Sequence, residues 1–345
     1  MEQKRIEKWD NARGLLIFLV VLGHVIEPGV NSKGYLNWLF LFIYLFHMPA
    51  FFFLSGMFAK GTVQNRRFDR IWGYVFLFFA MKIFVFLSKV IAQGKLPGFH
   101  VFWEDGIPWY AFCMAVFLLT AILAQNLEKK YVLAGAILLA CFAGYDDAVG
   151  DALVLSRSIC FFPFFFAGLC VAGEDLRKQL SNKWVRIISG VLVLSLLLLI
   201  WREIDHVYWI RQLVTGRNPF SRLKRYSEYG ALLRLIYYLA AAALGMMVLA
   251  IVPEGRSIFA FLGRRSLPIY VFHIPLLNLL NAGQLRDRFV NWKGFPTHLL
   301  PCLLLTVLVV GVCAGSVPDR ICRAIMNVRC DAGNGSNRLD EKQVS

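Results

Sequence analysis

The first apolar run of the chain carries two side chains that can do chemistry, Arg13 and His24. They are eleven residues apart, a spacing that on a helix brings them within ~20° of one direction and ~16 Å apart along the axis. Glu27 follows His24 by three residues, so its carboxylate can orient the imidazole. The pattern favours a histidine general base. A snorkelling Arg13 and a hydrogen-bonded structural His24 are the alternatives.

Two further histidines, His47 and His273, lie within apolar runs, and a proline follows each by two residues (Pro49 and Pro275). A proline in a helix leaves one backbone carbonyl without its usual partner, which opens a polar niche beside each histidine. A kinked helix with a satisfied histidine explains each one equally well. Three histidines at similar depth favour a shared polar cavity, because ionisable groups are costly inside a membrane. The catalytic candidates are therefore His24, Arg13, Glu27, His47 and His273.

Three arginines, Arg66, Arg67 and Arg70, precede the third apolar run. Arg67 and Arg70 project from nearly the same face of a helix, and guanidinium groups bind phosphates through forked hydrogen bonds. These arginines are candidates for binding a phosphate-bearing cosubstrate. From the residues alone, anchoring at the inner membrane surface is the simpler explanation.

Candidate substrate-binding residues are Arg157, Trp109 and Asp105. Arg157 begins a phenylalanine-rich run on the side of the membrane where orientation rules require no arginine. Trp109 and Asp105 belong to an outer connection in which aromatic faces stand beside carboxylates, an arrangement that suits sugar rings. Interfacial anchoring by Arg157 and an ordinary aromatic belt at Trp109 are the alternatives.

The elements that must position these side chains are predicted to be membrane helices. Of the 345 residues, 58% are hydrophobic and 17% charged, against about 25% charged in soluble proteins. Lipid tolerates no unpaired backbone groups, and the alternation of a barrel strand is absent. We predict an all-α polytopic membrane protein with about ten transmembrane helices around a central polar cavity. The predicted spans are 14–30, 37–58, 71–92, 107–124, 131–145, 158–172, 185–201, 230–252, 266–281 and 298–317.

These spans form one predicted domain, residues 1–329, followed by a disordered tail at 330–345. Lysine and arginine favour the connections on the N-terminal side, which predicts a cell (inner or plasma) membrane protein with both termini in the cytoplasm. The basic loop at 202–229 opposes that bias; it is either solvated or in contact with an anionic lipid-linked or phosphorylated acceptor. The net charge of +15 is dispersed among the connections, so no nucleic-acid partner is expected. The cysteines lack zinc-ligand spacing, and no metal is predicted.

In these residues the chain resembles the acyltransferase-3 family of membrane acyltransferases, and more closely its fucose 4-O-acetylase-like branch. The similarity extends over nearly all predicted spans, and the order of the motifs is more specific than any one of them. The matching motifs are Trp9-Asp10-Asn11-Ala12-Arg13-Gly14 with His24, Phe46-His47-Met48-Pro49 with Phe53-Leu54-Ser55-Gly56, Arg67 with Arg70, Pro108-Trp109-Tyr110, Phe161-Phe162-Pro163-Phe164-Phe165-Phe166-Ala167-Gly168, and Leu262-Gly263-Arg264-Arg265-Ser266-Leu267 with Ile269-Tyr270-Val271-Phe272-His273.

The resemblance implies an enzyme that moves an acetyl group from cytoplasmic acetyl-CoA to a hydroxyl of a lipid-linked or cell-surface carbohydrate. It matches Arg13 and His24 to the family's essential pair, and Arg67 and Arg70 to its cytoplasmic two-arginine motif. The acceptor sugar and position, the acyl chain length, an acyl-histidine intermediate and the oligomeric state stay open. The main alternative is a secondary transporter that uses intramembrane His, Arg and Glu, although no inverted repeat is found.

Overall fold

The structure, a computed structural model, describes residues 6–30, 36–100, 103, 106–150, 152–290 and 299–327. It is 83% helical, and the described residues form no strand beyond an isolated bridge between Trp103 and Ala152. The prediction of an all-α protein is therefore confirmed. The predicted tail at 330–345 and the candidate Asp105 lie outside the described residues.

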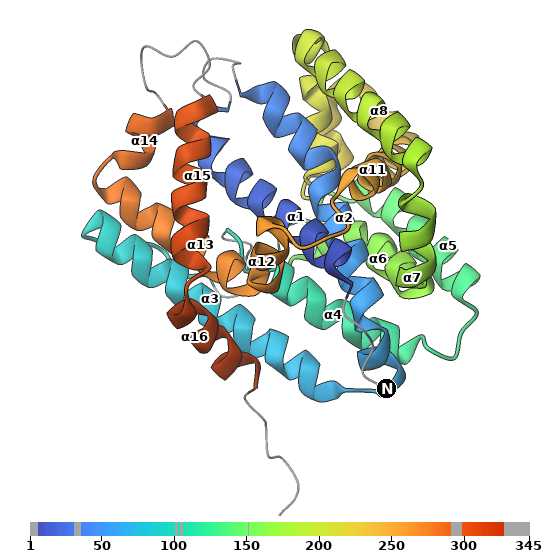
Figure 1. The fold of residues 1–345 in the computed structure, drawn as a ribbon, viewed down its shortest axis with the longest axis horizontal. Helices are drawn as coiled ribbons and strands as arrows, with labels where there is room; N and C mark the ends of the chain where they lie inside the picture. Colours follow the sequence, from blue (N-terminus) through green and yellow to red (C-terminus); the bar gives the residue numbers. More distant parts are fainter. Residues whose placement is uncertain are drawn as a thin grey trace, which may run out of the picture.

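Each of the ten predicted spans coincides with one helix, and shorter helices connect them (Figure 1). The helices in chain order are α1 (Glu7–Ile26), η1 (Glu27–Gly29), α2 (Asn37–Gln64), α3 (Phe68–Gln93), α4 (Trp109–Leu123), α5 (Lys129–Phe142), η2 (Ala143–Tyr145), α6 (Leu155–Cys170), α7 (Gly173–Leu180), α8 (Lys183–Arg202), α9 (Ile204–Val207), η3 (Tyr208–Ile210), α10 (Arg211–Val214), η4 (Phe220–Tyr229), α11 (Gly230–Ile251), α12 (Ile258–Arg264), α13 (Ser266–Ala282), α14 (Leu285–Val290), α15 (Leu299–Cys313) and α16 (Ser316–Met326).

Length and composition identify the membrane helices. In the described part of the chain, five segments are long and apolar enough to cross a membrane: α1 with η1, α2, α3, α8, and η4 with α11. The count reaches seven if the bent pairs α6 with α7 and α15 with α16 are each one span. It stays below the predicted ten because α4, α5 and α13 have only 15, 14 and 17 residues.

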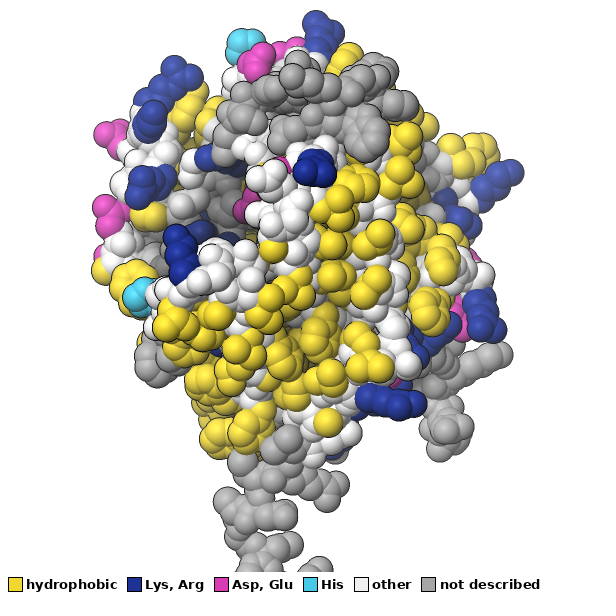
Figure 2. Space-filling view, turned by 90° about the vertical axis from the view of Figure 1, so that its left-hand side faces the viewer, with side chains coloured by type: hydrophobic (Ala, Val, Ile, Leu, Met, Phe, Trp, Pro, Cys, Tyr) yellow, Lys and Arg dark blue, Asp and Glu magenta, His cyan; other side chains and the backbone are white. Residues whose placement is uncertain are grey.

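The outer surface is apolar around the middle of the molecule. Figure 2 shows a broad band of hydrophobic side chains across one face, with most of the lysine and arginine side chains at its margins. On α8, at the periphery of Figure 1, the buried residues are Ser189 and Ile200, and many of its large apolar side chains are exposed. Such a surface is unfavourable in water and favourable against lipid chains. The chain is therefore an all-α polytopic membrane protein.

Two helix pairs approach so closely that only glycine fits between them. A Cβ at Gly56 of α2 would overlap a carbonyl oxygen of α6, and a Cβ at Gly168 of α6 would overlap a carbonyl oxygen of α2. The central helix α1 and the short α12 meet in the same reciprocal way through Gly14 and Gly263. Small residues at such contacts are the usual means of helix association in lipid, where backbones must approach closely. These glycines therefore fix the spacing of α1 and α2, which both carry candidate site residues.

A buried lysine fixes the amino-terminal end of α1. Lys8 is fully buried, and its Nζ lies 2.7 Å from the carboxylate of Glu254 and donates to two carbonyls at the end of α11. Glu254 also accepts from Ser181 at 2.6 Å and pairs with Arg177 at 3.4 Å. Asn11 donates to two carbonyls of the α11–α12 connection. Buried polar groups need such partners, so the polar residues at the start of α1 anchor this helix.

This network makes the stability of the protein sensitive to acid. Burial by itself raises the pKa of Glu254, but hydrogen bonds from Lys8 and Ser181, with the charges of Lys8 and Arg177, outweigh burial and hold that pKa below 4.5. A lowered carboxyl pKa stabilises the folded state above the unfolded-state pKa, and this contribution is lost as pH falls through the folded-state pKa. We therefore expect the melting temperature of the detergent-purified protein to fall below about pH 4.5.

The matched variant is Glu254→Gln, which keeps the size of the side chain and removes its titration. We expect this variant to melt lower than the natural protein at neutral pH, because it leaves Lys8 buried without a counter-charge. Its melting temperature should then change less on acidification. Identical pH profiles for the two proteins would contradict the role assigned to Glu254.

Candidate active site

A cavity of about 550 Å³ lies between the helices that carry the predicted site residues. Its lining includes Arg13 and His24 of α1, which lie ~16 Å apart along the helix axis, so the cavity extends at least that far along α1. Glu27 of η1, residues of α2, α3, α4, α6, α10 and α13, and parts of the connections also line it. The lining residues include His47, Tyr74, Trp109, Arg157, Arg211, Arg217, Ser266 and Tyr270.

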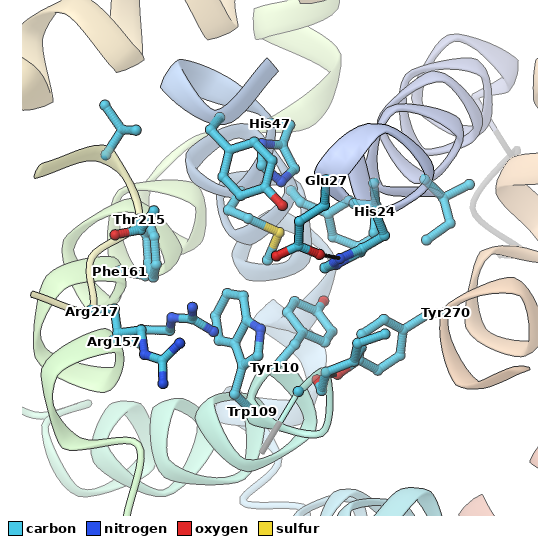
Figure 3. Close-up of a pocket in the computed structure, with 18 of the residues that line it drawn as sticks. His24, Glu27, His47, Trp109, Tyr110, Arg157, Phe161, Thr215, Arg217 and Tyr270 are labelled. Atoms are coloured by element: carbon cyan, nitrogen blue, oxygen red, sulfur yellow. Dashed lines mark hydrogen bonds and ion pairs between the residues drawn. The ribbon is translucent and has the colours of Figure 1, made fainter. Parts of the chain in front are cut away.

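The carboxylate of Glu27 holds the imidazole of His24 in the cavity wall (Figure 3). Nδ1 of His24 lies 3.3 Å from Oε2 of Glu27. An ionised carboxylate only accepts hydrogen bonds, so this contact puts the proton on Nδ1 and leaves Nε2 of the neutral ring as an acceptor. The side chain of His24 is 24% exposed, so a substrate can reach it. Arg286 of α14 donates to the backbone carbonyl of His24 and fixes the end of α1.

The other two candidate histidines take different positions. His47 lines the cavity, and its Nδ1 donates to the carbonyl of Ile43, one turn earlier in α2, at 2.7 Å. His273 is fully buried and is not a lining residue, but its ring centroid lies 5.4 Å from that of His24. Its Nδ1 is 2.9 Å from two carbonyls of the preceding turn of α13. Two of the three histidines therefore share the cavity, and the third packs against His24.

Arg13 turns across the molecule to α13. Its Nη2 donates to the hydroxyl of Ser266 at 3.1 Å, and its guanidinium carbon lies 5.5 Å from the ring centroid of Phe58. A snorkelling arginine would extend toward the membrane surface instead. Because Arg13 lines the cavity and is held by a neighbouring helix, its charge is available to a substrate at the end of the cavity far from His24.

The three-arginine cluster lies at the turn between α2 and α3 and does not line the cavity. Arg67 holds Asp69 with two hydrogen bonds of 2.7 and 3.3 Å, and Arg70 lies 3.9 Å from the same carboxylate. Tyr74, one turn beyond Arg70 on α3, is a lining residue. The turn that carries Arg66, Arg67 and Arg70 is therefore close to the Arg13 end of the cavity, and a phosphate there must compete with Asp69.

Arg157 and Trp109 form a stacked pair in the cavity wall. The guanidinium carbon of Arg157 lies 4.4 Å from the ring centroid of Trp109, a distance at which the cation and the aromatic face attract each other. Both side chains come from the first turns of their helices, α6 and α4. Figure 3 shows Arg157 and Trp109 on the far side of the cavity from Glu27 and His24.

The sequence left open whether the basic loop at 202–229 is solvated or contacts an acceptor, and it singled out none of the loop's residues as site candidates. The loop residues Arg211 and Arg217 line the cavity, as does Tyr270 of α13. The loop is basic although it lies on the side of the membrane where the orientation rule predicts few lysines and arginines. That exception indicated that its arginines could have a role other than orientation. The tyrosines carried no such signal, because aromatic residues are abundant throughout the apolar runs.

Fold and site together define a class of protein: a polytopic membrane protein with a polar cavity that brings histidine, carboxylate and arginine side chains together within its helices. The sequence profile described as "Acyltransferase domain" matches residues 6–317. The chain belongs to the acyltransferase-3 family. It is therefore a membrane acyltransferase, and this class is favoured over the transporter alternative.

Two curated relatives are similar to the chain. Nodulation protein NolL of Sinorhizobium fredii (strain NBRC 101917 / NGR234) is 28% identical over 311 residues, which cover 81% of each chain. Nodulation protein NolL of Mesorhizobium japonicum (strain LMG 29417 / CECT 9101 / MAFF 303099) is 35% identical over 65 residues, 18% of this chain and 17% of the relative. No solved structure matches the chain.

Proposed function

We propose that this protein transfers an acetyl group from cytoplasmic acetyl-CoA to a hydroxyl of a lipid-linked or cell-surface carbohydrate. The observation that carries the proposal is the pairing of His24 with Glu27 in a cavity that also contains Arg13, within a chain of the acyltransferase-3 family. The proposed location is the inner or plasma membrane with both termini in the cytoplasm, as the lysine and arginine distribution favours.

The chemistry needs a base because a sugar hydroxyl is a weak nucleophile at neutral pH. Nε2 of His24 accepts the hydroxyl proton as the oxygen attacks the thioester carbonyl carbon. The tetrahedral intermediate collapses with cleavage of the carbon–sulfur bond, and the imidazolium returns its proton to the leaving CoA thiolate. Glu27 keeps Nδ1 protonated and stabilises the imidazolium, as the acidic member of a catalytic triad does.

The remaining cavity residues bind and orient the substrates. Arg13 binds the donor, because it lines the end of the cavity far from His24, where the oxyanion of the intermediate forms. His47 and His273 have their Nδ1 atoms committed to backbone carbonyls, which fixes both rings: His47 in the cavity wall and His273 packed against His24. In a two-step variant, a histidine is itself acetylated and then passes the acetyl group to the acceptor.

The donor and the acceptor approach the cavity from different ends in this proposal. Arg67 and Arg70, with Arg66 beside them, bind the CoA phosphates at the α2–α3 turn through forked hydrogen bonds. The pantetheine arm of acetyl-CoA then extends past Arg13 toward His24. Trp109 and the Arg157 guanidinium stacked on its ring both line the cavity and are proposed to contact the acceptor sugar, and Asp105 is a further proposed sugar contact.

Calorimetric titration of the detergent-purified protein with acetyl-CoA tests the donor. We expect micromolar binding in the natural protein and in His24→Ala, and at least tenfold weaker binding in Arg67→Ala/Arg70→Ala, because charged hydrogen bonds to phosphate contribute about 1.5–3 kcal/mol each. Absence of acetyl-CoA binding in well-folded natural protein would reject the donor and leave only the broader acyltransferase class.

A further inference from the structure

The segment between α8 and α11 forms one wall of the cavity. It runs through α9, η3 and α10 before η4 begins, and six of its residues line the cavity: Arg211, Gln212, Val214, Thr215, Arg217 and Asn218. Its short helical elements mix apolar residues with Asp205, His206, Arg211 and Gln212. The segment therefore contributes to the cavity wall and is not only a solvent-exposed connection.

Three side chains from membrane helices hold the backbone of this segment in place. Ser156 of α6 donates to the carbonyl of Gly216 at 2.8 Å, and Tyr237 of α11 donates to the carbonyl of Val214 at 3.3 Å. Arg234 of α11, which is 1% exposed, donates to the carbonyl of Leu213 at 3.2 Å. A buried arginine in a membrane helix is costly, so this contact indicates that the protein needs the segment to be held at the cavity wall.

The segment adds two guanidinium groups to the one that α6 provides. Arg157, Arg211 and Arg217 all line the cavity, and Figure 3 shows Arg157 and Arg217 across from His24 and Glu27. Existing contacts hold the arginines: Arg157 stacks on Trp109, and Arg211 donates to the hydroxyl of Tyr208 at 2.9 Å. A guanidinium has five N–H donors in one plane, more than a single partner uses, so it can bind an oxyanion in addition to its contacts within the protein.

We infer that Arg157, Arg211 and Arg217 form a subsite for an anionic group, a phosphate or a carboxylate, carried by the acceptor carbohydrate. Planar, forked donors from three lining residues of one cavity match the oxygens of both groups. The inference rests on the proposed acyl transfer, because it takes His24 as the point that the acceptor hydroxyl must reach. The acceptor is then an acidic or phosphate-linked glycan rather than a neutral one.

The position of the subsite favours the acceptor over the donor. Figure 3 shows Arg157 and Arg217 across the cavity from Glu27 and His24, so a ligand that spans the cavity there can contact both sides. Arg13 and the α2–α3 turn lie toward the end of the cavity far from His24. We therefore assign the donor to the Arg13 end of the cavity and the arginines across from His24 to the second substrate.

Binding of three sugars to the detergent-purified protein tests the subsite. The probes share one ring: glucose 1-phosphate carries a phosphate, glucuronic acid a carboxylate, and methyl glucoside no charge. We expect calorimetry at constant ionic strength to show that at least one charged probe binds about tenfold or more tightly than methyl glucoside. Preference for glucose 1-phosphate identifies a phosphate-linked acceptor, and preference for glucuronic acid identifies an acidic sugar.

A pair of matched variants assigns the preference to the cavity. Arg211→Gln/Arg217→Gln should lose the discrimination between charged and neutral probes. Arg222→Gln/Arg225→Gln removes the same charge from the same loop, but at exposed positions outside the cavity lining. This variant should still discriminate between charged and neutral probes. Melting curves without ligand confirm that both variants fold. Discrimination that persists in the first variant, equal binding of the three probes, or no binding of either charged probe overturns the inference.

The same variants separate this inference from the proposed function. Acetyl-CoA binding should be unchanged in Arg211→Gln/Arg217→Gln. If this variant loses acetyl-CoA binding instead, Arg211 and Arg217 bind the donor. The proposed subsite for an anionic acceptor is then rejected, and the acetyltransferase proposal stands. If the natural protein discriminates the probes but does not bind acetyl-CoA, the proposed donor fails and the anionic subsite stands.

Discussion

Replacement of His24 by alanine is expected to lower the rate of acetyl transfer by about 10²–10⁴-fold, the usual contribution of a positioned general base. The imidazole lines the cavity and its Nδ1 is held by Glu27, which leaves Nε2 as the acceptor for the hydroxyl proton. Transfer of radiolabelled acetyl groups from acetyl-CoA into the glycan fraction of membrane vesicles measures the effect. Acetyl-CoA binding should be unchanged.

The control for this prediction is His206→Ala. His206 belongs to α9, is exposed and does not line the cavity, so its loss should leave the rate unchanged. Glu27→Gln keeps the shape of the side chain but removes its charge, and we expect an intermediate loss because the imidazolium is then less stabilised. A His24→Ala protein with the rate of the natural protein would show that another group accepts the proton.

Substitution of Gly56 by alanine is expected to destabilise the protein by about 1–3 kcal/mol or more, because overpacking of a close contact forces backbone shifts. A Cβ at this position would overlap a backbone carbonyl of α6 rather than a flexible side chain, so α2 and α6 must separate. The His47 helix then moves relative to Arg157. Thermal melting in detergent measures the loss of stability, and activity should fall with it.

Gly61 supplies the matched control on the same helix. A Cβ at Gly61 would meet no atom within 4 Å, so Gly61→Ala should leave stability unchanged or raise it by about 0.4–1 kcal/mol through the lower entropy of the unfolded chain. If the two variants melt alike, the close approach of α2 and α6 does not contribute to stability as the structure indicates.

The membrane helices could be predicted from the sequence because soluble folds do not contain so many apolar runs long enough to cross a bilayer. The shared face of Arg13 and His24 also follows from helix geometry alone, and both residues line one cavity. Gly56 and Gly168 were recognisable only as parts of motifs. Their role in helix contact needs the position of the opposing backbone, which no single segment encodes.

Other features depend on contacts between distant segments. The seven-residue α12 is too short to stand out as an apolar run, and it forms against α1 at Gly14 and Gly263. Asn11 was recognisable only as part of the motif that precedes Arg13, and the structure shows that it anchors α1 to the α11–α12 connection. Arg211 and Arg217 could not be placed because the turn that carries them is held by Ser156 and Arg234, residues far away in the sequence.

The most direct test of the proposed transfer follows a labelled acetyl group through the natural protein. Sealed inside-out vesicles receive radiolabelled acetyl-CoA on their outer, cytoplasmic face, and the carbohydrate inside them is then analysed for ester-linked label. We predict label in the glycan fraction as an alkali-labile ester, absent from vesicles without the protein. Well-folded protein that leaves the glycan unlabelled, or that labels it only when acetyl-CoA is placed on the other face, would contradict this mechanism.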